Sequence, residues 1–171
     1  MKPPTLTRRR VLVIDDNEAI HADFRKILAP QVQAGGFAAA KAAFLGAPGP
    51  SAGPATQVRF ELDTAGQGQE GVQKAQAACA AGEPYLMAFV DMRMPPGWDG
   101  ATTIKHLWRV DPHIQVVICT AFSDCSLETL ADELGHSDQL LILKKPFDNA
   151  EVYQLATALS EKRIAHQVAA L

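Results

Sequence analysis

Short apolar runs alternate with amphipathic stretches along most of the chain. After the first run, Ile20, Phe24 and Leu28 recur at the spacing of one helix face, and similar stretches follow the later runs. The runs themselves predict strands at residues 11–14, 58–62, 85–90, 114–119 and 140–143. The pattern therefore predicts five strands that alternate with five helices.

This alternation predicts a parallel sheet, because parallel neighbours must be joined by crossovers and the crossovers are usually helices. Four of the runs are continuously apolar, as strands buried on both faces are. In the second run, Val58, Phe60 and Leu62 alternate with polar residues, which is typical of an edge strand. We expect a doubly wound α/β fold with a five-stranded parallel sheet.

Polar residues mark the expected starts of three helices. Asn17 precedes the first helix and Ser123 precedes the fourth, where either side chain could cap the helix. Asp148 and Glu151 have the spacing of a capping box at the start of the last helix.

The last helix is expected to change its apolar face near Ser160. Val152 and Leu159 lie on one side, whereas Ile164 and Val168 lie on a nearly opposite side. We expect the end of the chain to pair with a second protomer, as a possible homodimer, or to lead into a downstream domain.

Residues 30–57 depart from the strand and helix pattern. They hold nine alanines, five glycines, four prolines and a single charged residue, Lys41. We interpret them as an insertion after the first helix. The whole chain, with 171 residues, 47% hydrophobic and 20% charged, has an ordinary globular composition that excludes disorder throughout.

Charge and cysteine content narrow the class of protein. A net charge of −3 gives no basic footprint for direct binding of nucleic acid. Cys79, Cys119 and Cys125 have neither disulfide nor zinc spacing, and the five histidines show no ligand spacing and are expected mostly at the surface. The apolar run at residues 11–14 is much shorter than a signal peptide requires, and no run has the length of a membrane span. We expect a cytoplasmic protein.

Polar side chains follow four of the predicted strands. They are Asp15 and Asp16 after the first, Asp91 after the third, Thr120 after the fourth, and Lys144 and Lys145 after the fifth. Ligands of open parallel sheets bind beyond the carboxyl ends of the strands. Crowded carboxylates favour a hard cation, most simply Mg²⁺, and an aspartate can accept a phosphoryl group whose oxygens a lysine and a threonine stabilise. These residue types predict phosphoryl transfer onto Asp91.

The chain resembles the receiver domains of two-component response regulators. The matching stretches, in the family's order and near its spacing, are VLVIDD at 11–16, FVDMRMP at 89–95, VVICTA at 116–121 and LILKKPF at 141–147. The resemblance implies a flavodoxin-like sheet of strand order 2-1-3-4-5 and a regulatory phosphoacceptor rather than an enzyme. It also implies a histidine kinase or phosphotransfer protein as phosphoryl donor and a downstream output domain or protein.

The resemblance also implies individual roles. Asp91 becomes the phosphoacceptor, and Thr120 and Lys145 become the switch and catalytic residues. Mg²⁺ would be held by Asp15, Asp16, Asp91 and the backbone carbonyl of Arg93, with Asp16 a direct ligand and Asp15 assisting. The bond between Lys145 and Pro146 is expected to be cis.

The sequence departs from the family pattern near these residues. Pro95–Trp98 lengthen the loop that follows Asp91 by one residue, Ile142 replaces the usual switch aromatic, and a bulky Phe122 lies two residues past Thr120. Family rates of dephosphorylation therefore need not apply.

Two other functions compete with this interpretation. Gly66, Gly68 and Gly71 form a literal GxGxxG pattern after a strand, which would suit a dinucleotide-binding module of Rossmann type. That assignment gives Asp15, Asp16, Thr120 and Lys145 no role. A haloacid dehalogenase type of phosphatase would need a D-x-D arrangement, which the first strand does not supply.

We expect three parts along the chain: a leader at residues 1–10, a receiver domain at 11–160, and a helical extension or linker at 161–171. The receiver is expected to be one segment of a multidomain signalling protein.

Overall fold

The computed structural model describes residues 8–28, 59–121, 126–135 and 138–170. It contains one parallel sheet with strand order β2-β1-β3-β4-β5. The strands are β1 (Arg9–Ile14), β2 (Phe60–Ala65), β3 (Met87–Asp91), β4 (Gln115–Thr120) and β5 (Leu140–Lys144). The predicted fold class and strand order are therefore confirmed. The predicted insertion at 30–57 lies outside the described residues.

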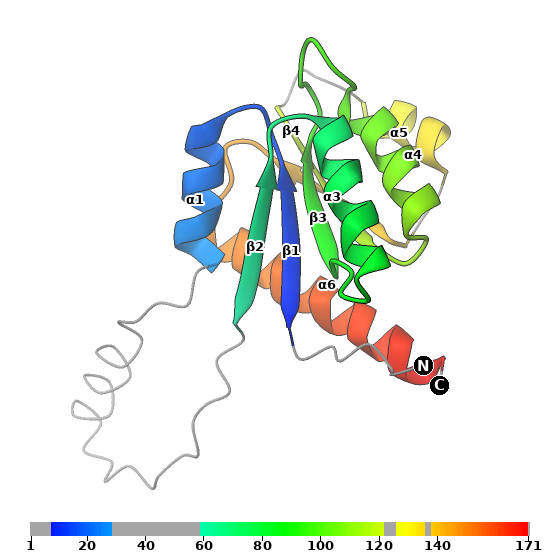
Figure 1. Cartoon of the computed structure of the whole chain (residues 1–171). Coiled ribbons are helices and arrows are strands. Elements are labelled where there is room, and N and C mark those ends of the chain that lie inside the picture. The colour runs from blue at the N-terminus through cyan, green and yellow to red at the C-terminus, as the bar shows by residue number, and fades with distance from the viewer. Residues whose placement is uncertain (1–7, 29–58, 122–125, 136–137, 171) are drawn as a thin grey trace, which may run out of the picture.

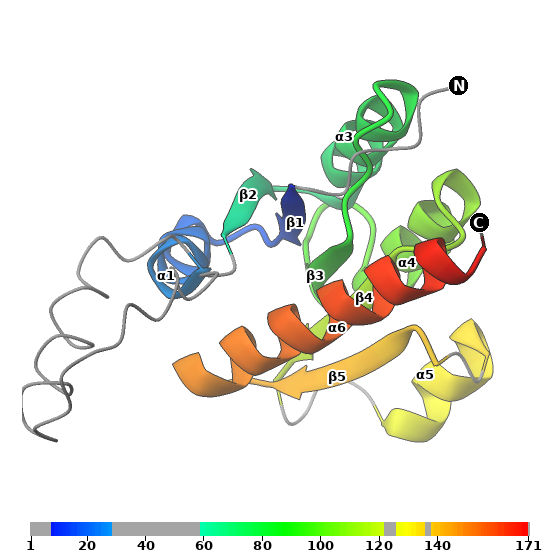
Figure 2. The ribbon, with the colours of Figure 1, turned by 90° about the horizontal axis from the view of Figure 1, so that it is seen from below.

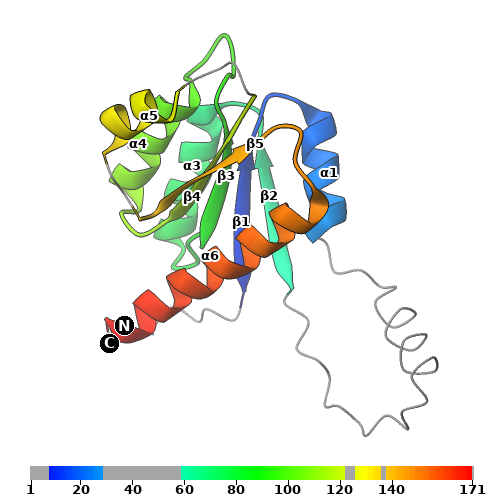
Figure 3. The same ribbon diagram turned by 180° about the vertical axis from the view of Figure 1, so that it is seen from behind.

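Helices cover both faces of the sheet (Figure 1). They are α1 (Glu18–Leu28), α3 (Gly68–Ala80), α4 (Gly100–Val110), α5 (Leu127–Leu134) and α6 (Asn149–Ala169). Helices α1 and α6 lie on one face, and α3, α4 and α5 lie on the other (Figures 1 and 3). Because a strand's side chains alternate between its faces, each central strand supplies both layers.

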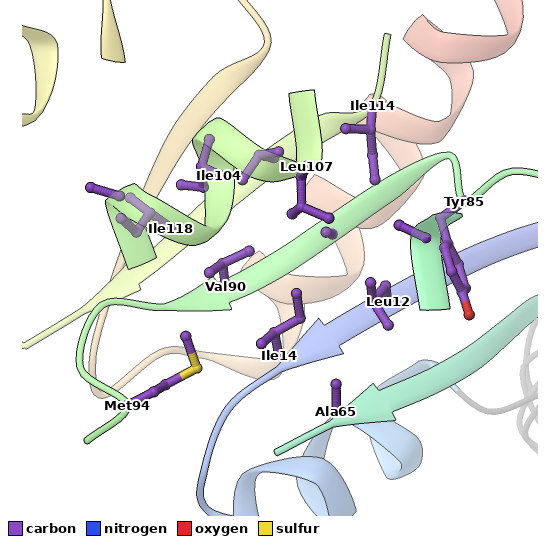
Figure 4. Packing of buried hydrophobic residues seen from close by; sticks show 14 of the residues in the cluster. Leu12, Ile14, Ala65, Tyr85, Val90, Met94, Ile104, Leu107, Ile114 and Ile118 are labelled. Carbon is purple, nitrogen blue, oxygen red and sulfur yellow. The ribbon is translucent and has the colours of Figure 1, made fainter. Parts of the chain in front are cut away.

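Two hydrophobic cores result from this arrangement. The α4-side core, part of which Figure 4 shows, includes Leu12, Ile14, Val90, Ile104, Leu107, Ile118 and Leu130. The α6-side core includes Val11, Val13, Phe24, Phe89, Val117, Val152 and Leu159. Neighbouring residues of β1 thus enter opposite cores, which confirms that the continuous apolar run is buried on both faces.

The edge strand β2 begins and ends later than the pattern predicts. It runs to Ala65 because its polar residues have partners on neighbouring elements. Asp63 Oδ2 accepts hydrogen bonds from Arg10 Nη2 at 2.9 Å and from the Tyr85 hydroxyl at 2.5 Å. Because these partners stabilise the carboxylate, the strand continues past the last apolar residue of the pattern. The apolar alternation alone therefore gave the wrong bounds for β2.

Two of the three predicted helix caps are present. Asn17 Oδ1 accepts from the Ala19 amide at 2.9 Å, and Asp148 and Glu151 form the capping box of α6. The cap predicted at Ser123 is wrong in position, because α5 begins at Leu127 with Ser126 as its cap. Ser126 Oγ accepts a hydrogen bond from the Thr129 amide at 3.2 Å, and so gives a partner to one of the amides in the first turn of α5.

The glycine pattern before α3 has a packing explanation. A Cβ added at Gly71 would lie 2.2 Å from Ile14 Cδ1, and one added at Gly68 would lie 2.1 Å from Thr103 Oγ1. The two glycines therefore allow α3 to approach β1 and α4 closely. The pattern also follows the edge strand β2, not the change of direction between β1 and β3 where ligands of such sheets bind. It no longer supports the dinucleotide-binding alternative.

Helix α6 continues through Ser160 without a break and crosses the sheet obliquely (Figures 2 and 3). Arg163, which is 3% exposed, donates two hydrogen bonds to the carboxylate of Asp111, at 3.0 and 3.1 Å. Glu161 pairs with Arg9, and Lys162 Nζ lies 3.3 Å from Asp138 Oδ2. The first turn beyond the predicted boundary at 160 is thus held against the rest of the domain, and the boundary itself stays a prediction.

Among the helices that the structure describes, none combines the length and the hydropathy required to span a membrane.

Replacing Arg163 by alanine should lower the free energy of unfolding by about 3–5 kcal/mol, because it leaves the buried Asp111 carboxylate without its partner. The neighbouring Lys162→Ala removes an ion pair to an exposed Asp138 and should cost at most about 1 kcal/mol. Urea denaturation of both variants measures the difference. Equal losses would show that the buried pair does not anchor α6.

Candidate functional site

Three carboxylates meet at the carboxyl edge of the sheet. Asp15 and Asp16 follow β1, and Asp91 ends the neighbouring strand β3. Their ligand atoms all lie within 4.8 Å of one another. Asp15 is buried, Asp91 is half-buried and Asp16 is exposed, so the cluster is open to solvent on the side of Asp16. We call these three residues the acidic cluster.

Lys145 supplies a positive charge to the acidic cluster. Its Nζ lies 3.0 Å from Asp91 Oδ1 and 3.2 Å from Asp15 Oδ2. The Lys145 amide donates to the Thr120 carbonyl at 2.9 Å, and the peptide bond to Pro146 is cis, as expected. Among the two lysines predicted after β5, the ion pairs to the acidic cluster therefore come from Lys145.

The charges of the cluster oppose one another. Burial raises the pKa of Asp91, and the nearby Asp15 and Asp16 raise it further, although the hydrogen bond from Lys145 lowers it. Burial lowers the pKa of Lys145, but the hydrogen bond to Asp91 and the charges of Asp15 and Asp91 outweigh this and raise it. Lys145 therefore stays a positively charged ammonium group. Its single positive charge faces the three carboxylates of the acidic cluster.

Thr120 ends β4 beside the site and is buried. Its hydroxyl donates to the Ala121 carbonyl at 3.0 Å. Ile142, at the position of the expected switch aromatic, lies in register with Ile118 and packs on the α4-side core. Phe122 lies outside the described residues.

The loop after Asp91 is anchored at both ends. Met94 is buried in the α4-side core, and Asp99 caps α4 by accepting from the Thr102 amide at 2.8 Å. Between them, the ring of Trp98 stacks on His106 with centroids 4.0 Å apart. The role of the Arg93 carbonyl as a metal ligand stays a prediction.

A model of the response regulator receiver domain matches residues 55–157 of the chain. The chain belongs to this family. The match begins after β1, yet the sheet places β1 between β2 and β3 and brings Asp15 and Asp16 to Asp91. The stretch VLVIDD, on which the resemblance partly rests, thus belongs to the same receiver domain.

Several known proteins are similar to this receiver domain. The chain is 38% identical over 90 residues to the DNA-binding transcriptional regulator NtrC of Salmonella typhimurium, a match that covers 53% of the chain but only 17% of that relative. A CheY-like receiver domain protein from Methanospirillum hungatei has a TM-score of 0.64 and 18% identity over 94% of this chain and 99% of its own. An adenylate cyclase structure from Rhodopirellula baltica has a TM-score of 0.63 and 20% identity, covering 91% of this chain and 90% of its own. These two structures support the fold alone.

One residue near the site was not foreseen. The histidines were expected mostly at the surface, but His21 is buried on α1 and its Nε2 lies 2.7 Å from the Asp15 carbonyl oxygen. Its position on the buried face of α1, three residues before Phe24, is the one sequence signal that could have indicated this.

Replacing Gly100 by alanine should destabilise the receiver domain by about 1–3 kcal/mol, because the new Cβ would lie 2.7 Å from the Asp91 backbone oxygen. Gly97→Ala, in the same loop, would meet only the far end of the flexible Gln67 side chain and should change stability by about 0.5 kcal/mol or less. Urea denaturation compares the two variants, and an equally tolerated Gly100→Ala would contradict the close approach.

Asp91→Asn should stabilise the metal-free receiver domain at neutral pH. The folded state raises the pKa of Asp91, so ionisation of this group weakens folding as the pH rises from the pKa of the unfolded chain through that of the folded state. At lower pH both states hold the neutral acid, and the advantage of the variant should disappear. Thermal unfolding across this pH range measures it, with Asp132→Asn on the exposed face of α5 as control. A gain in stability of Asp91→Asn that is the same at every pH would contradict the raised pKa of Asp91.

Proposed function

We propose that this receiver domain accepts a phosphoryl group on Asp91 and thereby controls an output. The observation that carries the proposal is the meeting of Asp15, Asp16 and Asp91 with Lys145 at one edge of the sheet. No other group of three or more potential metal ligands occurs among the described residues. The proposed role is regulatory, so the chemistry on Asp91 would be the domain's own phosphorylation and dephosphorylation.

The acidic cluster fits a hard divalent cation. Its donor set consists of carboxylate oxygens, and a single ammonium leaves its negative charge in excess. We propose Mg²⁺, held by Asp15, Asp16, Asp91 and the Arg93 carbonyl. When bound, it would supply positive charge toward the oxygens of the incoming phosphoryl group.

The residues of the chain would share the remaining work. A carboxylate oxygen of Asp91 attacks the phosphorus of a phosphohistidine, an O–P bond forms, the P–N bond breaks, and the histidine nitrogen of the donor keeps the electron pair. Lys145, which binds Asp91 Oδ1, would stabilise the charge on the transferring oxygens. The Thr120 hydroxyl would exchange the Ala121 carbonyl for a phosphoryl oxygen. With Ile142 at the switch position, this change would proceed without rotation of an aromatic ring.

The partners follow from the same proposal. The donor would be a histidine kinase or a phosphotransfer protein, and the output would be a downstream domain or protein. Since the chain spans about 17% of NtrC, we propose that this receiver is one segment of a multidomain signalling protein. A homodimer through α6 also stays a prediction, and beyond Arg163 the side chain that supports it is Val168, which is 61% exposed.

Incubation with Mg²⁺ and acetyl phosphate should add one phosphoryl group to the protein, as measured by intact mass, and Asp91→Asn should abolish the gain. Lys145→Met should slow phosphorylation about a hundredfold or more, because it removes the ammonium group that lies beside Asp91 Oδ1 and would stabilise the transferring oxygens. Lys144→Met is the matched control and should react near the rate of the unchanged protein. Phosphorylation of Asp91→Asn to the same extent, or independence of Mg²⁺, would overturn the proposal.

A further inference from the structure

The side chain of His21 contacts the backbone of the acidic cluster. It lies in the first turn of α1, is 6% exposed, and its Nε2 is 2.7 Å from the carbonyl oxygen of Asp15. A carbonyl oxygen only accepts hydrogen bonds, so Nε2 must carry the hydrogen and donate it. The geometry therefore assigns the ring the protonation state with hydrogen on Nε2.

Each polar group of Asp15 is bonded to a different part of the fold. The Asp15 amide donates to the Ala65 carbonyl at 3.0 Å, and Oδ1 accepts from the Asn17 amide at 2.8 Å. Oδ2 accepts from Lys145, and the carbonyl accepts from His21. Since Asp15 is buried, a carbonyl without this partner would be costly.

The carbonyl bond also fixes the start of the next residue. The carbonyl of Asp15 and the amide of Asp16 belong to one planar peptide unit, so a fixed carbonyl fixes the orientation of that plane. Asp16 is exposed, and its carboxylate is therefore directed mainly by its own backbone. A rotated peptide plane would displace the Asp16 carboxylate from the cluster.

We propose that His21 is a positioning residue of the cation site, which acts through the Asp15–Asp16 peptide and touches neither cation nor phosphoryl group. This inference rests on the proposed binding of Mg²⁺ at the acidic cluster. Partners that orient metal ligands typically contribute about 10–100-fold to metal affinity, so His21 has a measurable effect.

The test compares two substitutions of His21 in the full chain. His21→Leu keeps an apolar side chain of similar reach but cannot donate a hydrogen bond, whereas His21→Gln places an amide donor near the position of Nε2. His166→Leu, on the exposed face of α6, is the control. Binding of Mn²⁺, a hard cation with the same preference for oxygen ligands, is followed by the electron paramagnetic resonance of the free ion.

We expect His21→Leu to weaken Mn²⁺ binding about tenfold or more and His21→Gln to restore it to within about threefold. Equal affinity of the unchanged protein and His21→Leu would overturn the inference while leaving the proposed function intact. Absence of Mn²⁺ binding by the unchanged protein would instead overturn the proposed function, and the inference with it.

A second measurement needs no variant and no metal. In ¹⁵N spectra of the metal-free protein, neutral His21 should carry its hydrogen on Nε2. His106 is the internal reference, because its Nδ1 lies 2.9 Å from the Thr102 carbonyl and should carry the hydrogen there. His21 with its hydrogen on Nδ1 alone would overturn the inference even if His21→Leu failed to fold.

Discussion

Repulsion between like charges at the carboxyl edge of the sheet is the constraint on which the site depends. Three carboxylates lie within 4.8 Å of one another and face one ammonium group. The cluster lies at the ends of two adjacent central strands that are buried on both faces, and their packing holds the backbone beneath it in place. A slip of either strand by one residue would turn its side chains to the opposite face, so the two cores and the charge cluster specify the same register.

The balance of charge differs between the carboxyl ends and the amino ends of the strands. At the carboxyl edge the negative charges exceed the positive ones, whereas at the amino edge Arg163 and Asp111 neutralise one another in a buried pair. The neighbouring pairs of Glu161 and Lys162 extend this balance along α6. The acidic cluster thus lies at the end of the strands opposite to the buried Arg163–Asp111 pair.

Sequence patterns predicted the parts of the fold that local rules control. Burial of β1, β3 and β4 on both faces, the order of elements and the capping box of α6 were confirmed, because burial on two faces and helix capping leave a mark within a few residues. The same prediction for β5 was wrong, because β5 lies at an edge of the sheet and its Leu141 is 40% exposed. The residues that meet at the acidic cluster could be predicted because they lie at or directly after the carboxyl ends of strands. The β2 boundaries, the cap of α5 and the burial of His21 could not. Asp63 is tolerated in a strand through Arg10 and Tyr85, which lie far away in the sequence, and local periodicity does not record such contacts. The same holds for the pairing of Arg163 with Asp111.

The position of β1 determines what counts as a foldable unit of this chain. Residues 55–157, where the family model matches, contain β2, β3, β4 and β5 but not β1. In the described sheet β2 has β1 as its only neighbour, and β1 also pairs with β3. A fragment cut at the limits of the match would lose the strand that joins β2 to the other strands. Phe89 and Val90 of β3, which belong to opposite cores, would each lose their paired residue on β1. Expression boundaries drawn from sequence similarity would thus cut through one sheet, whose strands extend from Arg9 to Lys144.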